Sequence, residues 1–88
     1  MNLKKTIMYY MDILADQKGV VDLDIVMDHV KQNNPQCNDQ SLDNAVEELK
    51  KEGYIAFIEW PDLSNDKKTF SRLSGHDRFY RKIKTYQE

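Results

Sequence analysis

Two histidines, one cysteine and three closely spaced aspartates are the residues of this chain that could support chemistry. His29 and His76 are not accompanied by a Cys/His cluster at the spacing of zinc ligands, so we expect no metal site. Cys37 would need a neighbouring histidine to act as a nucleophile, and the sequence indicates none. We therefore predict no catalytic residue, no metal and no cofactor.

The aspartates at positions 22, 24 and 28 could suggest calcium. The residues between them are apolar and core-forming, and the glycine of a calcium-binding loop is absent. Asp22 is instead expected to cap a helix. The chain has three glycines and no glycine-rich phosphate loop, so an enzyme is not expected.

The charges are distributed unevenly along the 88 residues. Residues 1–66 carry six Lys and thirteen Asp or Glu, a formal charge of −7. Residues 67–88 carry seven Lys or Arg and two acids, a charge of +5, which leaves −2 for the chain. This asymmetry indicates an electrostatic interaction surface near the basic end. The alternative is a solubilising surface whose cations pair with the acidic portion of the same chain.

Composition places the chain among soluble globular proteins, with 40% hydrophobic and 32% charged residues. No apolar run approaches the roughly 20 residues that span a bilayer. The apolar start is interrupted by Asp12 and lacks a small-residue cleavage site, so no signal peptide is expected. A lone cysteine fits a reducing compartment. We expect a single cytoplasmic domain over residues 1–88, without membrane contact.

Apolar spacing predicts three helices in the first part of the chain. The first covers residues 2–16, and a short edge strand follows at residues 20–21. Asp22 caps the second helix, which ends at residues 33–35. A third helix, capped by Asn38 or Asp39, has an apolar face and stops at Gly53. That face consists of Leu42, Ala45, Val46 and Leu49.

The second part of the chain is expected to form a hairpin and a last helix. Aromatic and β-branched residues predict a strand at residues 54–60, a polar loop at 61–68 and a returning strand at 69–73. Ser74 and Asp77 resemble a capping box, which predicts a C-terminal helix. That helix would bury Phe79, Ile83 and Tyr86.

This order of elements resembles a winged helix-turn-helix domain over nearly the whole chain. "LDNAVEELKKEGYI" (42–55) resembles the third helix and first wing strand, and "WPDLSNDKKTF" (60–70) resembles the wing. "LSGHDRFYRKI" (73–83) resembles the entry into a C-terminal helix, with Asp77 where that family usually has glycine. The third-helix run is similar to small phage- and mobile-element-type proteins of the YjcQ family. The resemblance implies an α+β fold with a three-helix core, a two-stranded wing hairpin, a short extra strand and a C-terminal helix.

The resemblance also implies binding of double- or single-stranded DNA, as a transcriptional regulator or mobile-element accessory protein. The third helix of such domains faces base edges, and the wing contacts phosphates. The acidic side chains Asp43, Glu47 and Glu48 oppose deep insertion into a groove. We expect the contacts to come from residues of the third helix, the wing and the last helix: Gln40, Ser41, Asn44, Lys51, Lys67, Lys68, Arg72, Arg78, Arg81 and Lys82.

A second hypothesis uses the acidic residues instead. Asp43, Glu47 and Glu48 would form part of an acidic face over the second and third helices, which suits a basic protein partner. The chain would then be an adaptor or an inhibitor, because fold does not determine function. Surplus aromatic residues in the terminal helices also leave a homodimer open.

Overall fold

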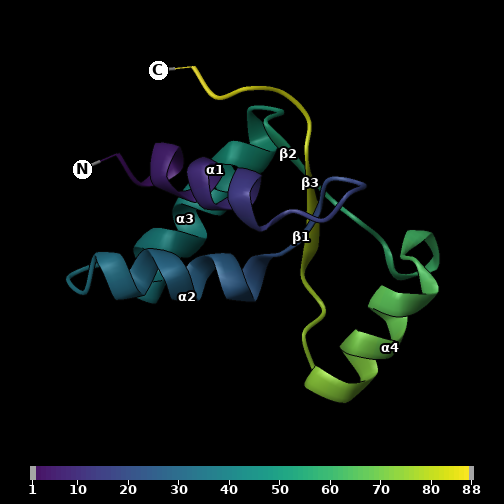
Figure 1. Ribbon diagram of the computed structural model, residues 1–88. Coiled ribbons are helices and arrows are strands. Elements are labelled where there is room, and N and C mark those ends of the chain that lie inside the picture. The colour runs from purple at the N-terminus through teal and green to yellow at the C-terminus, as the bar shows by residue number, and fades with distance from the viewer. Residues whose placement is uncertain (1, 88) are drawn as a thin grey trace.

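The computed structural model describes residues 2–87 and shows an α+β protein with four α-helices and a small antiparallel sheet (Figure 1). Between residues 2 and 87, no helix combines the length and apolar character needed to cross a membrane. The elements in chain order are α1 (Leu3–Leu14), β1 (Val20–Asp22), α2 (Leu23–Asn33), α3 (Asp39–Lys51), β2 (Ile55–Phe57), the 3-10 helix η1 (Trp60–Asp62), α4 (Asn65–Ser74) and β3 (Phe79–Lys82).

Helices α1, α2 and α3 pack around the main hydrophobic core. Each has a polar N-cap whose side chain accepts a backbone N–H of the first turn: Asn2, Asp22 and Asn38. The predicted apolar face of α3 is buried, with Leu42 and Leu49 fully so. The predictions of three helices and of the Asp22 cap are therefore confirmed.

The three strands form a sheet of order β1-β3-β2, in which the last strand lies between the other two. Val21, Tyr80 and Phe57 are in register across it. Because successive side chains of a strand point to opposite faces, Val21 and Tyr80 join the main core, whereas Val20 and Phe79 face the other side. The predicted short strand at residues 20–21 lies at an edge, as expected.

Residues 58–78, here called the outer layer, connect β2 to β3 and contain η1 and α4. Figure 1 shows α4 on the opposite side of the sheet from α1, α2 and α3. A second, smaller cluster of buried side chains lies between the outer layer and the sheet. Its members are Val20, Ile58, Leu63 and Phe79. The sheet is thus covered on both faces.

The predicted wing is wrong in its local structure, because α4 replaces the polar loop at 61–68 and the returning strand at Thr69–Leu73. Ser64 caps this helix by accepting the N–H of Lys67. Gly75 ends it in the left-handed conformation, at a φ of 77°, which favours glycine. The strand predicted at residues 54–60 is also shorter, since β2 covers Ile55–Phe57.

The predicted C-terminal helix is wrong as well. Ser74 is the last residue of α4, and its hydroxyl accepts the N–H of His76 instead of opening a new helix. Phe79 is buried as predicted, but from strand β3. Ile83 is 57% exposed, contrary to expectation, whereas Tyr86 packs against the main core. Among residues 83–87 no helix is present.

Candidate nucleic-acid interface

Three of the predicted phosphate-binding cations are paired with acidic residues of the first part of the chain: Lys67, Arg78 and Lys82. Lys82 on β3 donates to Asp12 of α1 at 2.9 Å. Lys67 on α4 lies 3.4 Å from a carboxylate oxygen of Asp16, in the α1–β1 connection. These contacts bear out the alternative of intramolecular pairing for part of the basic segment.

Arg78 is the most strongly engaged cation among the predicted contacts. Its Nε and Nη2 donate to Asp24 Oδ1 at 3.1 and 2.5 Å, and Nη1 lies 3.7 Å from Asp43. Partial burial opposes its charge, but the bonds to Asp24 outweigh this and raise the pKa of Arg78. Arg78 lies before β3, and Arg81 and Lys82 are neighbours on that strand, so the last helix predicted to carry these cations is absent here. Arg78 therefore fastens α2 and α3 to the sheet.

Lys68, Arg72 and Arg81 form no ion pair with any residue in the described range 2–87. Lys68 and Arg72 lie one turn apart on α4, on the same side of the helix. The Arg72 guanidinium lies 5.5 Å from the ring centroid of Trp60, which is 42% exposed. Arg81 is exposed and leaves β3 on the same face of the sheet as Phe79, the face that the outer layer covers.

On α3 the predicted contact residues are less available. Gln40 donates to Asn44 at 3.0 Å, so the two amides partly satisfy each other. Ser41 is half-buried, and its backbone N–H donates to the Asn38 cap. Lys51 is exposed at the end of the helix. Sequence spacing placed these residues on one helix correctly, but the bond between Gln40 and Asn44 reduces what their two amides can offer a base edge.

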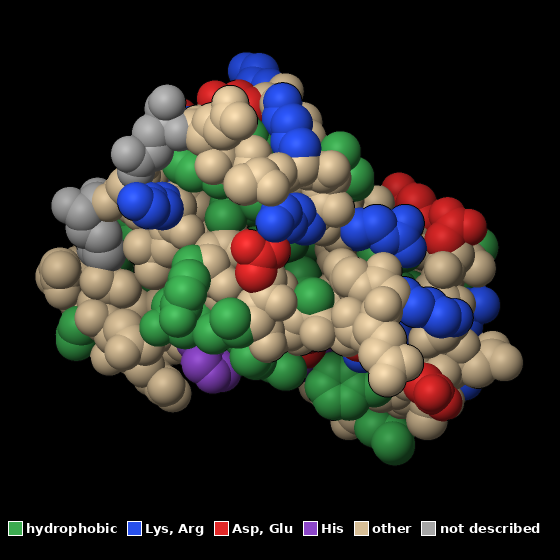
Figure 2. Space-filling model, turned by 45° about the horizontal axis from the view of Figure 1, so that its top comes forward, with side chains coloured by type: hydrophobic (Ala, Val, Ile, Leu, Met, Phe, Trp, Pro, Cys, Tyr) green, Lys and Arg blue, Asp and Glu red, His purple; other side chains and the backbone are tan. Residues whose placement is uncertain are grey.

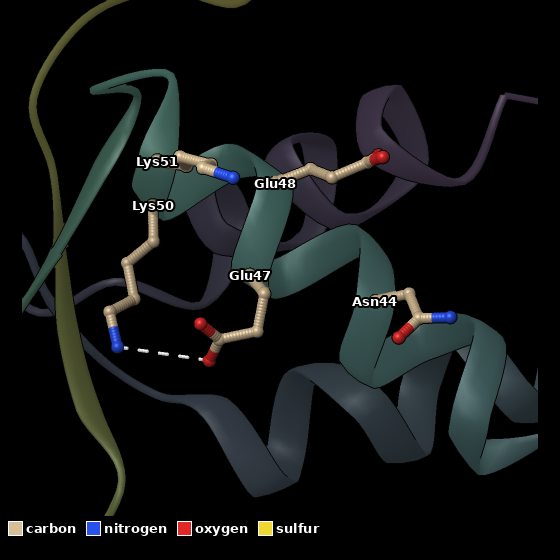
Figure 3. A pocket seen from close by; sticks show the side chains of 5 residues that line it. All are labelled: Asn44, Glu47, Glu48, Lys50 and Lys51. Carbon is tan, nitrogen blue, oxygen red and sulfur yellow. Dashed lines mark ion pairs between the residues drawn. The ribbon is translucent and has the colours of Figure 1, made fainter.

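Acidic side chains dominate the exposed side of α3. Figure 3 shows Asn44, Glu47, Glu48, Lys50 and Lys51 around an open hollow, with Glu47 directed toward Lys50. Glu47 and Lys50 are 3.7 Å apart. Glu47 and Glu48 have side chains 70% and 61% exposed, and Asp43 on the same helix is 56% exposed. A polyanion that approached this helix would be repelled.

The acidic end of α3 is tied to α1 through Lys4. Its ammonium group lies 2.7 Å from Glu52 and 3.1 Å from Glu48. The bond to Glu52, and to a smaller extent the bond to Glu48, raises the pKa of Lys4. Of the three acids assigned to a protein-binding face, Glu48 has the shortest ion pair, and Glu47 and Asp43 have longer ones of 3.7 Å to Lys50 and Arg78.

A cluster of polar side chains joins the outer layer to the start of α2. His76 Nδ1 lies 2.6 Å from Asp22 Oδ2, and the other oxygen of Asp22 accepts the N–H of Asp24. The imidazole and both carboxylates could surround a cation, since their ligand atoms lie within 4.8 Å of one another. Each carboxylate already has a donor, however, and Arg78 places a positive charge on Asp24. The cluster is therefore better explained as an ion-pair network.

Sequence reasoning did not find the His76–Asp22 contact. The Asp22 cap was evident from its place before an apolar helix, but its partner is 54 residues away. No periodicity or motif connects positions at that separation. The side chain of His76 is 33% exposed, whereas that of Asp22 is 8% exposed.

Basic and acidic side chains lie near one another on the face drawn in Figure 2. Figure 2 shows Lys and Arg side chains spread across the upper and right-hand parts of one face, with Asp and Glu side chains beside them. Large apolar side chains also reach the surface of the outer layer, with Leu73 85% and Phe70 39% exposed. The face drawn in Figure 2 is thus not uniformly basic over the described residues, unlike the binding face of a dedicated DNA-binding protein.

The chain was compared with protein families, curated proteins and solved structures. No match is found. Function must therefore be inferred from the contacts and charges of this chain. The cations that remain available to bind a polyanion, because they have no ion pair within residues 2–87, include Lys68 and Arg72 of the outer layer and Arg81 of β3.

Proposed function

We propose that this is a small nucleic-acid-binding protein of the winged-helix type, a transcriptional regulator or mobile-element accessory protein, that binds through its outer layer. The three-helix layer followed by a small antiparallel sheet is compatible with a winged-helix arrangement. The insertion of α4 between β2 and β3 distinguishes it from a simple wing hairpin. The YjcQ-like character of the third-helix run is part of the same proposal.

The observation that carries the proposal is the group Lys68, Arg72 and Trp60 on the outer layer, together with Arg81 on the sheet face that this layer covers; the four residues are here called the basic platform. Its three cations have no carboxylate partner in residues 2–87, so their charge is available to phosphates. The Arg72 guanidinium against the exposed Trp60 ring combines a phosphate donor with a surface on which a base can stack. Such a site tolerates many sequences, because every base has a flat face.

Acidic neighbours limit the strength of this platform. Glu59 and Asp62 flank Trp60 in the sequence, and both are exposed. Their charges offset part of the attraction, so we expect binding that is clear at low salt and weak at moderate salt. On α3, Gln40, Ser41, Asn44 and Lys51 would contribute shallow contacts at most.

Trp60 makes the proposal directly testable, because it is the one tryptophan of the chain. Its fluorescence reports on the platform without a label. Titration with single-stranded DNA and with duplex DNA at low salt should quench the emission, and added salt should reverse the quenching. No change of Trp60 emission and no binding at low salt would contradict the proposal.

A matched pair of variants locates the surface. Arg72→Glu with Arg81→Glu reverses two charges on the platform, and Lys50→Glu with Lys51→Glu reverses two at the end of α3. Fluorescence anisotropy of a labelled oligonucleotide should show loss of binding for the first pair and a smaller reduction for the second. An equal loss from both would mean that non-specific net charge, not the platform, determines binding.

The exposed acids of α3 favour a second candidate function, an adaptor or inhibitor that binds a basic protein. Glu47 keeps 70% of its side chain exposed beside the open hollow of Figure 3. A pull-down from the native host should recover a partner that Glu47→Lys with Glu48→Lys no longer binds. Arg72→Glu with Arg81→Glu should leave that partner bound, and recovery unaffected by the α3 variant would exclude the acidic face.

A further inference from the structure

The outer layer has little hydrophobic attachment to the rest of the molecule. Within residues 58–78 the buried side chains are Ile58, Leu63 and Ser71, and Ser71 is the one that α4 contributes. The main core, in contrast, includes buried residues from α1, α2, α3 and all three strands. Since apolar burial is the main stabilising contribution to packing, polar contacts must account for a larger share of the attachment of α4.

In the described part of the chain, a polar side-chain contact lies near each end of α4, and the Arg78–Asp24 pair follows farther along the outer layer. Near its start, Lys67 lies 3.4 Å from Asp16, a longer and partly exposed pair. Beyond its end, His76 bonds Asp22 at 2.6 Å. The Phe70 ring of α4 packs edge-on against both the His76 imidazole, at 5.6 Å, and the Phe79 ring, at 6.4 Å. The shorter polar contact and the aromatic contact thus share one residue, His76.

The geometry on both sides of the His76–Asp22 contact is fixed by the backbone. Asp22 is 8% exposed and caps α2, so its carboxylate cannot move without uncapping that helix. Gly75 turns the chain at the end of α4, and the N–H of His76 donates to the Ser74 hydroxyl at 3.1 Å. We propose that the His76–Asp22 pair is a proton-controlled latch, in which protonated His76 holds the outer layer against the sheet and loss of the proton loosens it.

The charges that face His76 agree with such a latch. The bond to Asp22 raises the pKa of His76, despite opposing desolvation, and Asp24 and Asp28 of α2 add to the rise. Arg78, beside Asp24, is the nearby positive charge, and Asp77 is the neighbouring acid in the sequence. Because the docked pKa lies above the ordinary value of 6.5, docking is fully favoured below that value. The contribution is lost as the pH rises through the raised pKa.

The latch is tested by the accessibility of the outer layer between about pH 5 and 9, where histidine titrates. Acrylamide quenching of Trp60, which lies in η1, should increase as the pH rises. Amide exchange in α4, corrected for its intrinsic pH dependence, should increase over the same range. Each unit by which docking raises the pKa corresponds to about a tenfold change in the docking equilibrium.

Three variants separate the latch from a general loss of stability. His76→Gln should give high, pH-independent accessibility. Asp22→Asn keeps a good N-cap for α2 but removes the charge. Helix α2 should therefore remain folded, while the pH-dependent increase in accessibility (the pH step) disappears. In that variant the NMR-measured pKa of His76 should fall toward 6.5. His29→Gln, which changes the other histidine, should keep the wild-type step, since His29 bonds Ile25 within α2.

The proposal has clear contrary results. A pH step that persists in His76→Gln would assign the titration to another group. A His76 pKa that is unchanged in Asp22→Asn would show that the pair does not couple protonation to docking. Wild-type accessibility that stays constant across the whole range would show that the protonation of His76 does not hold the outer layer, and that its apolar contacts and the pairs of Lys67 and Arg78 suffice.

Discussion

Helices α3 and α4 begin and end in the same way but are attached to the molecule very differently. Each starts at a polar cap, Asn38 or Ser64, and each is followed by a glycine in the left-handed conformation. Helix α3 buries four apolar side chains, whereas α4 buries Ser71 alone. Caps and end glycines therefore determine where a helix forms, and the apolar stripe determines how firmly it is held.

The largest expected difference between the main core and the outer layer comes from a matched pair of leucine truncations. Leu49 on α3 is fully buried in the main core, and Leu63 is 7% exposed in the smaller cluster. Leu49→Ala should lower the free energy of unfolding by about 2–5 kcal/mol, and Leu63→Ala by about 2 kcal/mol or less. Urea denaturation monitored by circular dichroism measures both. Equal losses would show that the outer layer is as tightly packed as the core.

The end glycines provide a second, smaller comparison. Gly53 and Gly75 have φ angles of 82° and 77°, and no atom would contact an added Cβ at either. Alanine should therefore cost about 1 kcal/mol at each, from backbone strain alone. Gly53→Ala should lower the stability of the whole protein, while Gly75→Ala should mainly increase amide exchange in α4. Hydrogen exchange resolved by residue distinguishes the two, and a global effect of Gly75→Ala would contradict the loose attachment of α4.

The Asp16 carboxylate gives a still smaller, pH-dependent effect. Burial alone would raise its pKa, but the N–H groups of Val20 and Lys18, together with Lys67, lower it. A lowered pKa stabilises the folded state above the ordinary value of 3.8, and this contribution is lost as the pH falls through the lowered one. Asp16→Asn should therefore be slightly less stable than wild type at neutral pH and equal to it in strong acid. Parallel thermal melts across that range provide the measurement.

The smallest expected effect is that of metal ions at the cluster of Asp22, Asp24 and His76, where the outer layer meets α2. The carboxylates of Asp22 and Asp24 already pair with His76 and Arg78, so zinc would have to displace these partners. Addition of zinc, or of a chelator, should leave the melting temperature unchanged. A stabilisation by zinc that His76→Gln abolishes would show instead that the cluster is a metal site.

The three-helix layer was predictable because its apolar residues recur with a helical period. Leu42, Val46 and Leu49 determine one face of α3, and all three are buried as expected. The outer layer was not predictable in this way. The polar residues at 61–68 are typical of a loop, and α4 has few apolar positions to show a period. The cap at Ser64 and the glycine at 75 were the signals of a helix there.

The candidate site was predictable only in part. The excess of cations after residue 66 is visible in the sequence, but their partners are not. Lys82 meets Asp12 and Arg78 meets Asp24 across 70 and 54 residues. Such contacts depend on the path of the chain through the sheet. Without that path, a paired lysine such as Lys82 and an unpaired one such as Lys68 appear equivalent.

The central position of β3 has a consequence for synthesis on the ribosome. The strands that flank it, β1 and β2, cannot pair with each other, because β3 lies between them. The three helices can collapse as they emerge, since their contacts are formed within residues 3–51. The sheet must wait until residues 79–82 leave the exit tunnel. Until then, the nascent chain exposes two short unpaired strands. We expect chaperone binding to be most useful during this period.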